Sequence, residues 1–169
     1  MTTINKSAEY SKAQQLVITR VINAPRELIF RAWTEPERMM KWWGPKGFTT
    51  HSCKIDLRPG GIIRFCMRSP DGFEIWCAGI YREIVEPERI VSTSYFTDKE
   101  GNQLPPTICG LGEDWPMETT ITVTLEDLKG KTKLTMRQAG VPINLEREGA
   151  RQGWSESFDR LAEFLSKKK

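Results

Sequence analysis

Few side chains in this sequence could carry out acid–base, nucleophilic or metal chemistry together. His51 is the only histidine, so a serine–histidine–acid arrangement would have to recruit that one residue. The cysteines form no C-x-x-C pair and have no companion histidines, which predicts neither a zinc site nor a thioredoxin-type motif. The four cysteines are Cys53, Cys66, Cys77 and Cys109. The residue types therefore predict no catalytic group, no metal and no cofactor, and they favour a role without catalysis.

Two further motif classes are also missing from the sequence. No G-x-S-x-G segment accompanies His51, as a nucleophile elbow would require. Pro59-Gly60-Gly61 stands between two strand-like runs, so it is read as a hairpin turn rather than a phosphate-binding loop. Asp56 and Arg58 flank that turn and are interpreted as turn-stabilising residues.

Composition and charge narrow the class of protein. The chain has 169 residues, a length typical of one domain, and 25 Lys and Arg against 22 Asp and Glu give a net charge of +3. This small surplus predicts no nucleic-acid partner, and Lys167, Lys168 and Lys169 are interpreted as a solvated end. No run approaches the roughly 20 apolar residues needed to cross a bilayer, and nothing resembles a signal peptide. We therefore expect a cytoplasmic protein with reduced cysteines.

Hydrophobic periodicity predicts one antiparallel sheet. Runs rich in branched residues, or alternating apolar and polar, are separated by turns that contain glycine or proline. The predicted strands are Leu16–Ile22, His51–Leu57, Ile62–Arg68, Phe73–Val85, Ile90–Phe96, Thr119–Leu125 and Lys133–Gln138. Residues 98–116, between the fifth and sixth runs, are expected to form a long loop.

Three helices are predicted around this sheet. Pro25 favours a helix start with Ile29, Ala32 and Trp33 on one face, and Thr34-x-x-Glu37 has the spacing of a capping box for a second helix to about Lys41. The long C-terminal helix has an apolar stripe made by Ala150, Trp154, Phe158, Leu161, Ala162 and Leu165. Residues 1–14 are expected to be a flexible tail, and 15–169 a single domain.

This order of elements, β-α-α-β-β-β-β-β-β-α, predicts an α+β fold in which a curved sheet of about seven strands wraps the long C-terminal helix. One helix does not fill the whole concave face, so we expect an apolar cavity beside it. Alternation on Ile62–Arg68 turns Phe65 and Met67 inward, whereas both faces of Phe73–Val85 are apolar and neither can be assigned. The pocket candidates are Trp42, Trp43, Phe65, Met67, Cys77, Tyr81, Tyr95, Met136, Gln138, Trp154 and Phe158.

Each of these candidates also has a plainer interpretation as part of the core. Trp42 and Trp43 point about 100° apart if helical, so one can be buried while the other covers a junction or stacks on a ligand. Trp154 and Phe158 are equally consistent with packing, since aromatic stripes at helical spacing usually pack.

Several segments resemble the activator-of-Hsp90-ATPase-like family, within the helix-grip superfamily of START-like and birch-pollen-allergen-like (SRPBCC) domains. The segments are Ala24-Pro25-Arg26-Glu27, Trp42-Trp43-Gly44-Pro45, residues 56–61 (DLRPGG), 67–72 (MRSPDG), 79–84 (GIYREI), 87–90 (PERI) and Gly153-Trp154. The resemblance covers roughly residues 14–166 and implies the helix-grip fold. It also implies that related families often carry a histidine where this chain has Gln138. The activity is not implied, because such folds carry binders, enzymes and co-chaperones.

Three functional hypotheses follow. The first is a domain that binds a small hydrophobic or aromatic molecule. The second is an enzyme acting on a small apolar substrate in the same cavity, with Tyr81, Gln138 or His51 positioning it. The third is an interaction protein that stimulates a chaperone ATPase, a role that would use an exposed surface and not the cavity. An exposed tryptophan or the 98–116 loop could in addition support a homodimer.

Overall fold

A computed structural model of the chain describes residues 15–142 and 145–167, so the tail expected at residues 1–14 lies outside the described residues. Its strands are β1 (Gln15–Ile22), β2 (Thr49–Ile55), β3 (Ile62–Arg68), β4 (Glu74–Val85), β5 (Arg89–Thr97), β6 (Gln103–Leu104), β7 (Thr119–Leu128) and β8 (Lys131–Ala139). They form one sheet of order β1-β8-β7-β5-β4-β3-β2, with β6 paired to β5, and every pairing is antiparallel.

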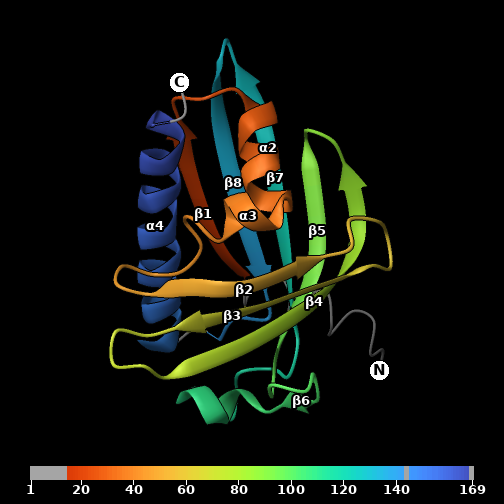
Figure 1. Cartoon of the computed structure of the whole chain (residues 1–169), viewed down its shortest axis with the longest axis vertical. Helices are drawn as coiled ribbons and strands as arrows, with labels where there is room; N and C mark the ends of the chain where they lie inside the picture. Colours follow the sequence, from red (N-terminus) through yellow and green to blue (C-terminus); the bar gives the residue numbers. More distant parts are fainter. Residues whose placement is uncertain (1–14, 143–144, 168–169) are drawn as a thin grey trace, which may run out of the picture.

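The helices lie on the concave side of this sheet. They are α2 (Arg26–Thr34), α3 (Pro36–Met39) and α4 (Leu145–Ser166), with a 3-10 turn, η1, at Pro106–Cys109. In Figure 1, α4 runs beside β1, while β2 and β3 cross in front of its lower half and α2 and α3 lie in front of the upper strands. The predicted α+β fold, with a curved sheet wrapped around a long C-terminal helix, is confirmed.

The core lies between α4, α2 and the inner face of the sheet. Strand β7 alternates as predicted, with Ile121, Val123 and Leu125 buried between half-buried threonines. Burial of these side chains, at roughly 25 cal/mol per Å² of apolar surface, is the main force that holds α4 against the sheet. The largest fully buried side chains include Trp42, Phe30, Phe158, Met39, Leu134, Met136 and Leu161.

Strand β4 has to approach β5 unusually closely at Gly79. A Cβ atom on Gly79 would lie 2.0 Å from the carbonyl oxygen of Thr93, so no larger residue fits there without movement of the backbone. At the same point the Ile80 amide donates to the Thr93 hydroxyl (3.0 Å). Glycine at this position is therefore explained by the close approach of the two strands.

Two local predictions need correction. Thr34 does not cap the second helix, because its hydroxyl donates to the Phe30 carbonyl (2.8 Å) and it ends α2 instead. Pro36 holds the preceding Glu35 in an extended conformation, so α3 begins at Pro36 without a side-chain cap. The 98–116 segment also contains structure of its own, since β6 pairs with the last residues of β5, Phe96 and Thr97, and η1 follows.

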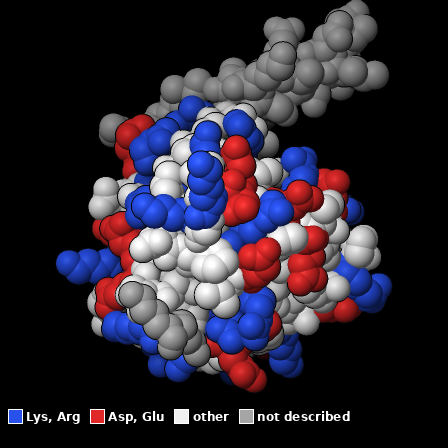
Figure 2. Space-filling view, turned by 90° about the horizontal axis from the view of Figure 1, so that it is seen from above, with Lys and Arg blue, Asp and Glu red and all other residues white. Residues whose placement is uncertain are grey.

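Charged side chains of both signs are mixed on the surface, in keeping with the small net charge of +3. Figure 2 shows basic and acidic side chains interspersed on the face seen from above, without a field of one sign. Within residues 15–142 and 145–167, no helix is long and apolar enough to cross a membrane.

Candidate functional site

A cavity of about 480 Å³ lies between α4 and the inner face of the sheet, at the end where α4 begins. That volume falls within the usual range for sites that hold small organic molecules. The lining residues are Trp43, Gly44, Pro45, Phe65, Met67, Cys77, Ser94, Phe96, Leu111, Trp115, Ile121, Gln138, Gly149, Ala150, Gly153, Trp154 and Ser157. We call this space the Trp43 pocket.

The Trp43 pocket exists because α4 presents small residues to it. Gly149, Ala150 and Gly153 face the space in the first half of the helix, whereas Phe158, Leu161 and Leu165 fill the core in the second half. A Cβ on Gly149 would meet nothing within 4 Å, and one on Gly153 would make only an ordinary contact with Pro45 (3.5 Å). Neither glycine is therefore required by close packing, and the helix leaves open space at this end.

The rim of the pocket is held to α4 by one arginine. Arg160 Nη1 donates to the carbonyl oxygens of Trp43, Gly44 and Pro45, at 3.3, 2.8 and 3.2 Å. Gly44 has φ +109°, a conformation that favours glycine. Partial burial lowers the pKa of Arg160 from its ordinary value, but the guanidinium stays charged and keeps the rim in place.

Trp43 is the centre of an aromatic cluster that forms one wall. Its ring centroid lies 5.3 Å from that of Phe65, 5.4 Å from that of Trp154 and 5.7 Å from that of Trp33, at interplanar angles of 69°, 85° and 88°. Edge-to-face pairs at these distances are favourable and hold the rings in defined orientations. The wall thus offers apolar and aromatic surface whose shape is set before any molecule enters.

The polar groups of the pocket are few and mostly paired with each other. Gln138 Oε1 accepts from Trp154 Nε1 (3.1 Å), and Gln138 Nε2 donates to the Thr119 hydroxyl (3.0 Å). Ser157 donates to the Gly153 carbonyl within α4 (2.9 Å). These bonds satisfy polar atoms that burial would otherwise leave at a cost of about 1–3 kcal/mol each.

Among the described residues that line the pocket, Cys77 is the only one with an ionisable side chain. Burial raises the pKa of the Cys77 thiol far above its ordinary value, which keeps the sulfur protonated and a poor nucleophile. The lining therefore offers no charged group and no acid–base pair to a bound molecule.

A second, much smaller space of about 30 Å³ lies next to the Trp43 pocket. The two spaces share Trp43, Phe65, Ser94 and Ile121. Tyr81 borders the smaller one, and its hydroxyl has no hydrogen-bond partner within the described part of the chain. Burial also raises the pKa of Tyr81, so its phenol stays neutral.

The structure brings six of the predicted pocket residues together and places five elsewhere. The six are Trp43, Phe65, Met67, Cys77, Gln138 and Trp154, and Cys77 identifies which face of β4 turns inward. Trp42, Met136 and Phe158 are fully buried within the hydrophobic core and do not line the pocket. Tyr81 borders the smaller space, and Tyr95 lies on the opposite face of β5 from Ser94 and Phe96.

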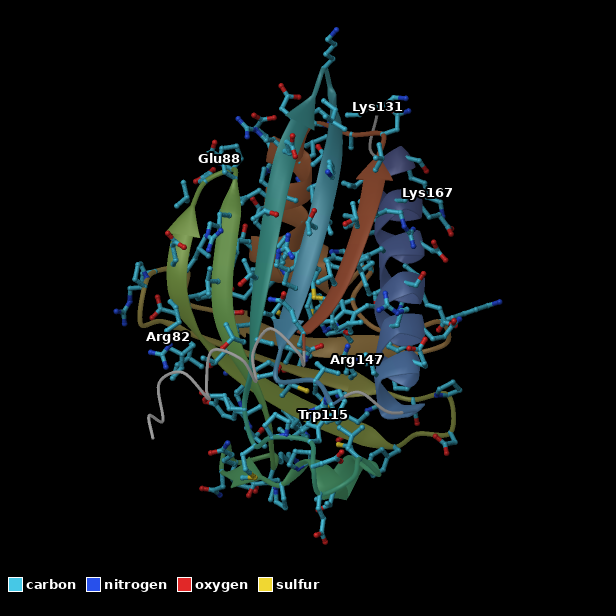
Figure 3. All side chains as sticks on the ribbon, turned by 180° about the vertical axis from the view of Figure 1, so that it is seen from behind. Arg82, Glu88, Trp115, Lys131, Arg147 and Lys167 are labelled. Atoms are coloured by element: carbon cyan, nitrogen blue, oxygen red, sulfur yellow. The ribbon has the colours of Figure 1, made fainter. Side chains whose placement is uncertain are left out.

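Sequence reasoning missed the contributions of the 98–116 segment and of the small residues. Leu111 and Trp115 close one side of the pocket from a region expected only as a loop. Figure 3 shows Trp115 at the end of the molecule opposite Glu88 and Lys131, next to the segment that carries η1. The signal for Gly149, Ala150 and Gly153 was available, since small residues occupied helical positions on the face of α4 that carries Trp154.

Comparison with protein families gives one match over most of the chain. The model of the family described as "Activator of Hsp90 ATPase homolog 1-like protein" matches residues 23–166. These residues include every strand except β1, all the helices and the whole lining of the Trp43 pocket. No curated protein matches the chain.

Solved bacterial structures share the fold. Protein NE0264 from Nitrosomonas europaea is 25% identical, with a TM-score of 0.74 over 92% of this chain and 96% of that one. Protein CV1439 from Chromobacterium violaceum is 29% identical, with a TM-score of 0.69 over 88% and 95% of the two chains. The AHSA1 protein from Silicibacter pomeroyi, at 18% identity and a TM-score of 0.73 over 92% and 99%, shows likeness of fold alone.

Proposed function

This chain belongs to the Activator of Hsp90 ATPase homolog 1-like family. Because the fold of this family supports ligand-binding domains in general, we propose that the chain binds a small neutral molecule in the Trp43 pocket. The molecule is mainly apolar or aromatic. The observation that carries the proposal is the change of residue size along α4, from Gly149, Ala150 and Gly153 at the cavity to Phe158 and Leu161 in the core.

Unfilled space beside α4 lowers the stability of the fold, and a binding function would account for its presence. Side chains that face open space lack the packing contacts of a filled core, so folds usually fill such volume with side chains. A glycine within a helix costs about a further 1 kcal/mol relative to alanine, and two of them face this space. A domain that holds a molecule here regains the lost contacts when the molecule is bound.

The lining also supports the chemical class of the ligand. A charged group would lose its hydration inside the pocket, and none of the described lining side chains offers it an opposite charge. Trp43, Phe65 and Trp154 instead offer ring faces and edges. Hydrogen bonds with a ligand would have to use Gln138, Ser94, Ser157, Trp115 or backbone groups, which are neutral and suit a neutral polar substituent.

The experiment uses N-phenyl-1-naphthylamine, a neutral naphthyl probe that fluoresces when it leaves water. Titration into the purified chain should give saturable binding at one site, with quenching of tryptophan emission. The variant Gly153→Leu adds a side chain that projects into the pocket and should weaken binding at least tenfold, about 1.4 kcal/mol. The neighbouring variant Gln152→Leu adds the same side chain on the exposed side of α4 and should bind like the parent protein.

Two results would contradict the proposal. One is the absence of saturable binding by the parent chain, for this probe and for a set of neutral aromatic and aliphatic molecules. The other is equal binding by Gly153→Leu and Gln152→Leu, provided that both melt cooperatively. A carboxylate-bearing analogue of the same naphthyl probe sharpens the test, because it should bind at least tenfold more weakly than the neutral probe.

A further inference from the structure

Three side chains with metal-binding atoms meet on the convex face of the sheet, on the side away from the Trp43 pocket. His51 comes from β2, Cys66 from β3 and Glu74 from β4, and one ligating atom from each lies within 4.8 Å of the other two. Phe65 and Met67, the neighbours of Cys66 along β3, point the other way into the pocket. The cluster is thus separate from the proposed ligand site.

A β-bulge places His51 in this cluster. Strands β2 and β3 pair in register up to Thr50 opposite Met67, and the pairing resumes with Ser52 opposite Cys66, so His51 is an additional residue. Two residues of a bulged strand face one on its partner, which bends the strand and redirects a side chain. The only histidine of the sequence is therefore directed by an irregularity of the backbone toward Cys66 and Glu74.

The separations suit a tetrahedral cation. His51 Nε2 and Glu74 Oε2 are 3.4 Å apart. Two ligands at the usual zinc–nitrogen and zinc–oxygen distances, about 2.0–2.2 Å, lie about 3.4 Å apart at a tetrahedral angle. A sulfur ligand at about 2.3 Å would lie about 3.6 Å from each of the others. Since the present separations are within 4.8 Å, Cys66 would need to move closer by about 1.2 Å at most.

Neighbouring groups affect cation binding by His51, Cys66 and Glu74 in both directions. The backbone amide of Ile75 faces the Cys66 sulfur and would stabilise a thiolate, while burial raises the pKa of the free thiol. Arg68 Nη2 lies 2.8 Å from the same Glu74 oxygen that approaches His51, so this cation competes for the carboxylate. The pair is about half exposed, and exposed pairs contribute only about 0–1 kcal/mol, so Arg68 can be displaced.

We propose that His51, Cys66 and Glu74 form a binding site for a thiophilic divalent cation such as Zn²⁺. Nitrogen, sulfur and carboxylate oxygen in this number are the donors of three-residue zinc sites, which keep a fourth position for water. Cys66 is buried, whereas His51 and Glu74 are 35% and 37% exposed, so the fourth position faces solvent. On binding, the S–H bond breaks, an S–metal bond forms and the proton passes to solvent. The cation would tie together β2, β3 and β4, and the last two of these strands carry Phe65, Met67 and Cys77 of the pocket lining.

The test uses Co²⁺ as a spectroscopic substitute for Zn²⁺, added to the full-length protein after chelator treatment and reduction. One equivalent should produce a near-ultraviolet sulfur-to-cobalt charge-transfer band, and Zn²⁺ should displace it. Cys66→Ser should abolish the band, while Cys109→Ser, in η1, should leave it unchanged. His51→Ala and Glu74→Gln, which alter exposed side chains and should leave the fold intact, should each weaken Co²⁺ binding at least tenfold.

Arg68→Gln provides a result that a merely adventitious cysteine would not give. Removal of the competing guanidinium frees the Glu74 carboxylate, so Co²⁺ affinity should rise severalfold. The proposal is overturned if the parent protein shows no charge-transfer band, if the band persists in Cys66→Ser, or if Arg68→Gln binds Co²⁺ more weakly than the parent. Because the site lies on the convex face, none of these outcomes bears on probe binding in the Trp43 pocket.

Discussion

Trp42 and Trp43 are neighbours in sequence, yet they belong to opposite kinds of environment. Trp42 is fully buried, and its indole nitrogen donates to the Ala32 carbonyl (3.0 Å) among the side chains of α2 and α3. Trp43 is half-buried and lines the cavity beside the first half of α4. We call these regions the core end, around Trp42 and Phe158, and the pocket end, around Trp43 and Trp154.

The difference between the two ends is decided by what faces each aromatic ring. At the core end α4 presents Phe158, Leu161 and Leu165, and at the pocket end it presents Gly149, Ala150 and Gly153. The aromatic cluster itself is continuous, since Trp42 and Trp43 lie 5.1 Å apart and Trp154 and Phe158 5.7 Å apart. A binding pocket at one end of a single aromatic cluster can therefore arise simply because the facing helix carries small residues there. The aromatic residues themselves need no special chemistry.

The largest expected effect compares the two tryptophans directly. Trp42→Ala should destabilise the fold by about 3–5 kcal/mol, the range for large buried aromatic residues. Trp43→Ala should cost about 1–2 kcal/mol less, because one side of its ring faces the cavity and has fewer packing contacts to lose. Urea unfolding of both variants measures the difference. Equal losses would mean that the pocket end is packed as tightly as the core end.

A second comparison concerns the buried hydrogen bonds at the two ends. Thr132 in β8 is fully buried and donates to the Ala24 carbonyl (2.7 Å), so Thr132→Val should cost about 1–3 kcal/mol by leaving that carbonyl unpaired. Gln138→Met frees Trp154 Nε1 and the Thr119 hydroxyl beside the cavity, where water can bond to them, and should cost about 0.5–1.5 kcal/mol. Thermal unfolding of the two variants tests the order, and a larger loss for Gln138→Met would show that water cannot replace the glutamine.

The contrast between the ends also explains how far the sequence could predict the molecule. Alternation in Thr119–Leu125 and the stripe from Trp154 to Leu165 report burial directly, so the sheet and the long helix were predictable. The inner face of β4 was not, because Ile75 and Cys77 alternate with Trp76 and Ala78 and both sets are apolar. Tyr95 was misplaced because aromatic character says nothing about which face of a strand it occupies.

Empty space and irregular pairing are harder still to predict from sequence. A glycine in a helix can mark close approach of another backbone, a frayed helix end or an adjacent cavity. For Gly153 the three-dimensional structure distinguishes these cases, because a Cβ there would make only an ordinary contact with Pro45 and the residue lines the pocket. The bulge at His51 changes which residues of β2 face Cys66, so residue spacing alone offers no reason to group His51, Cys66 and Glu74. Both features depend on contacts between distant segments, which local patterns do not record.

The smallest expected effect tests whether glycine at position 149 is needed for packing or only leaves space at the pocket end. Gly149 lies within α4, has no positive φ, and would place a Cβ where nothing lies within 4 Å. Gly149→Ala should therefore stabilise the protein by about 0.4–1 kcal/mol, because alanine restricts the unfolded chain without any clash. Guanidinium unfolding at several protein concentrations measures the gain. Gly79→Ala is the matched opposite, since its Cβ would lie 2.0 Å from the Thr93 carbonyl oxygen and should destabilise the fold.

A gain from Gly149→Ala would mean that the sequence gives up stability at the mouth of the Trp43 pocket that one methyl group could restore. Glycine at a position where alanine is both tolerated and favourable is then explained by the space it leaves and not by the backbone it permits. The same variant should retain N-phenyl-1-naphthylamine binding within about threefold, because a methyl group removes little of a cavity of about 480 Å³. A loss of stability in Gly149→Ala would instead indicate that the first half of α4 is held by close packing, and the contrast between the two ends would fail there.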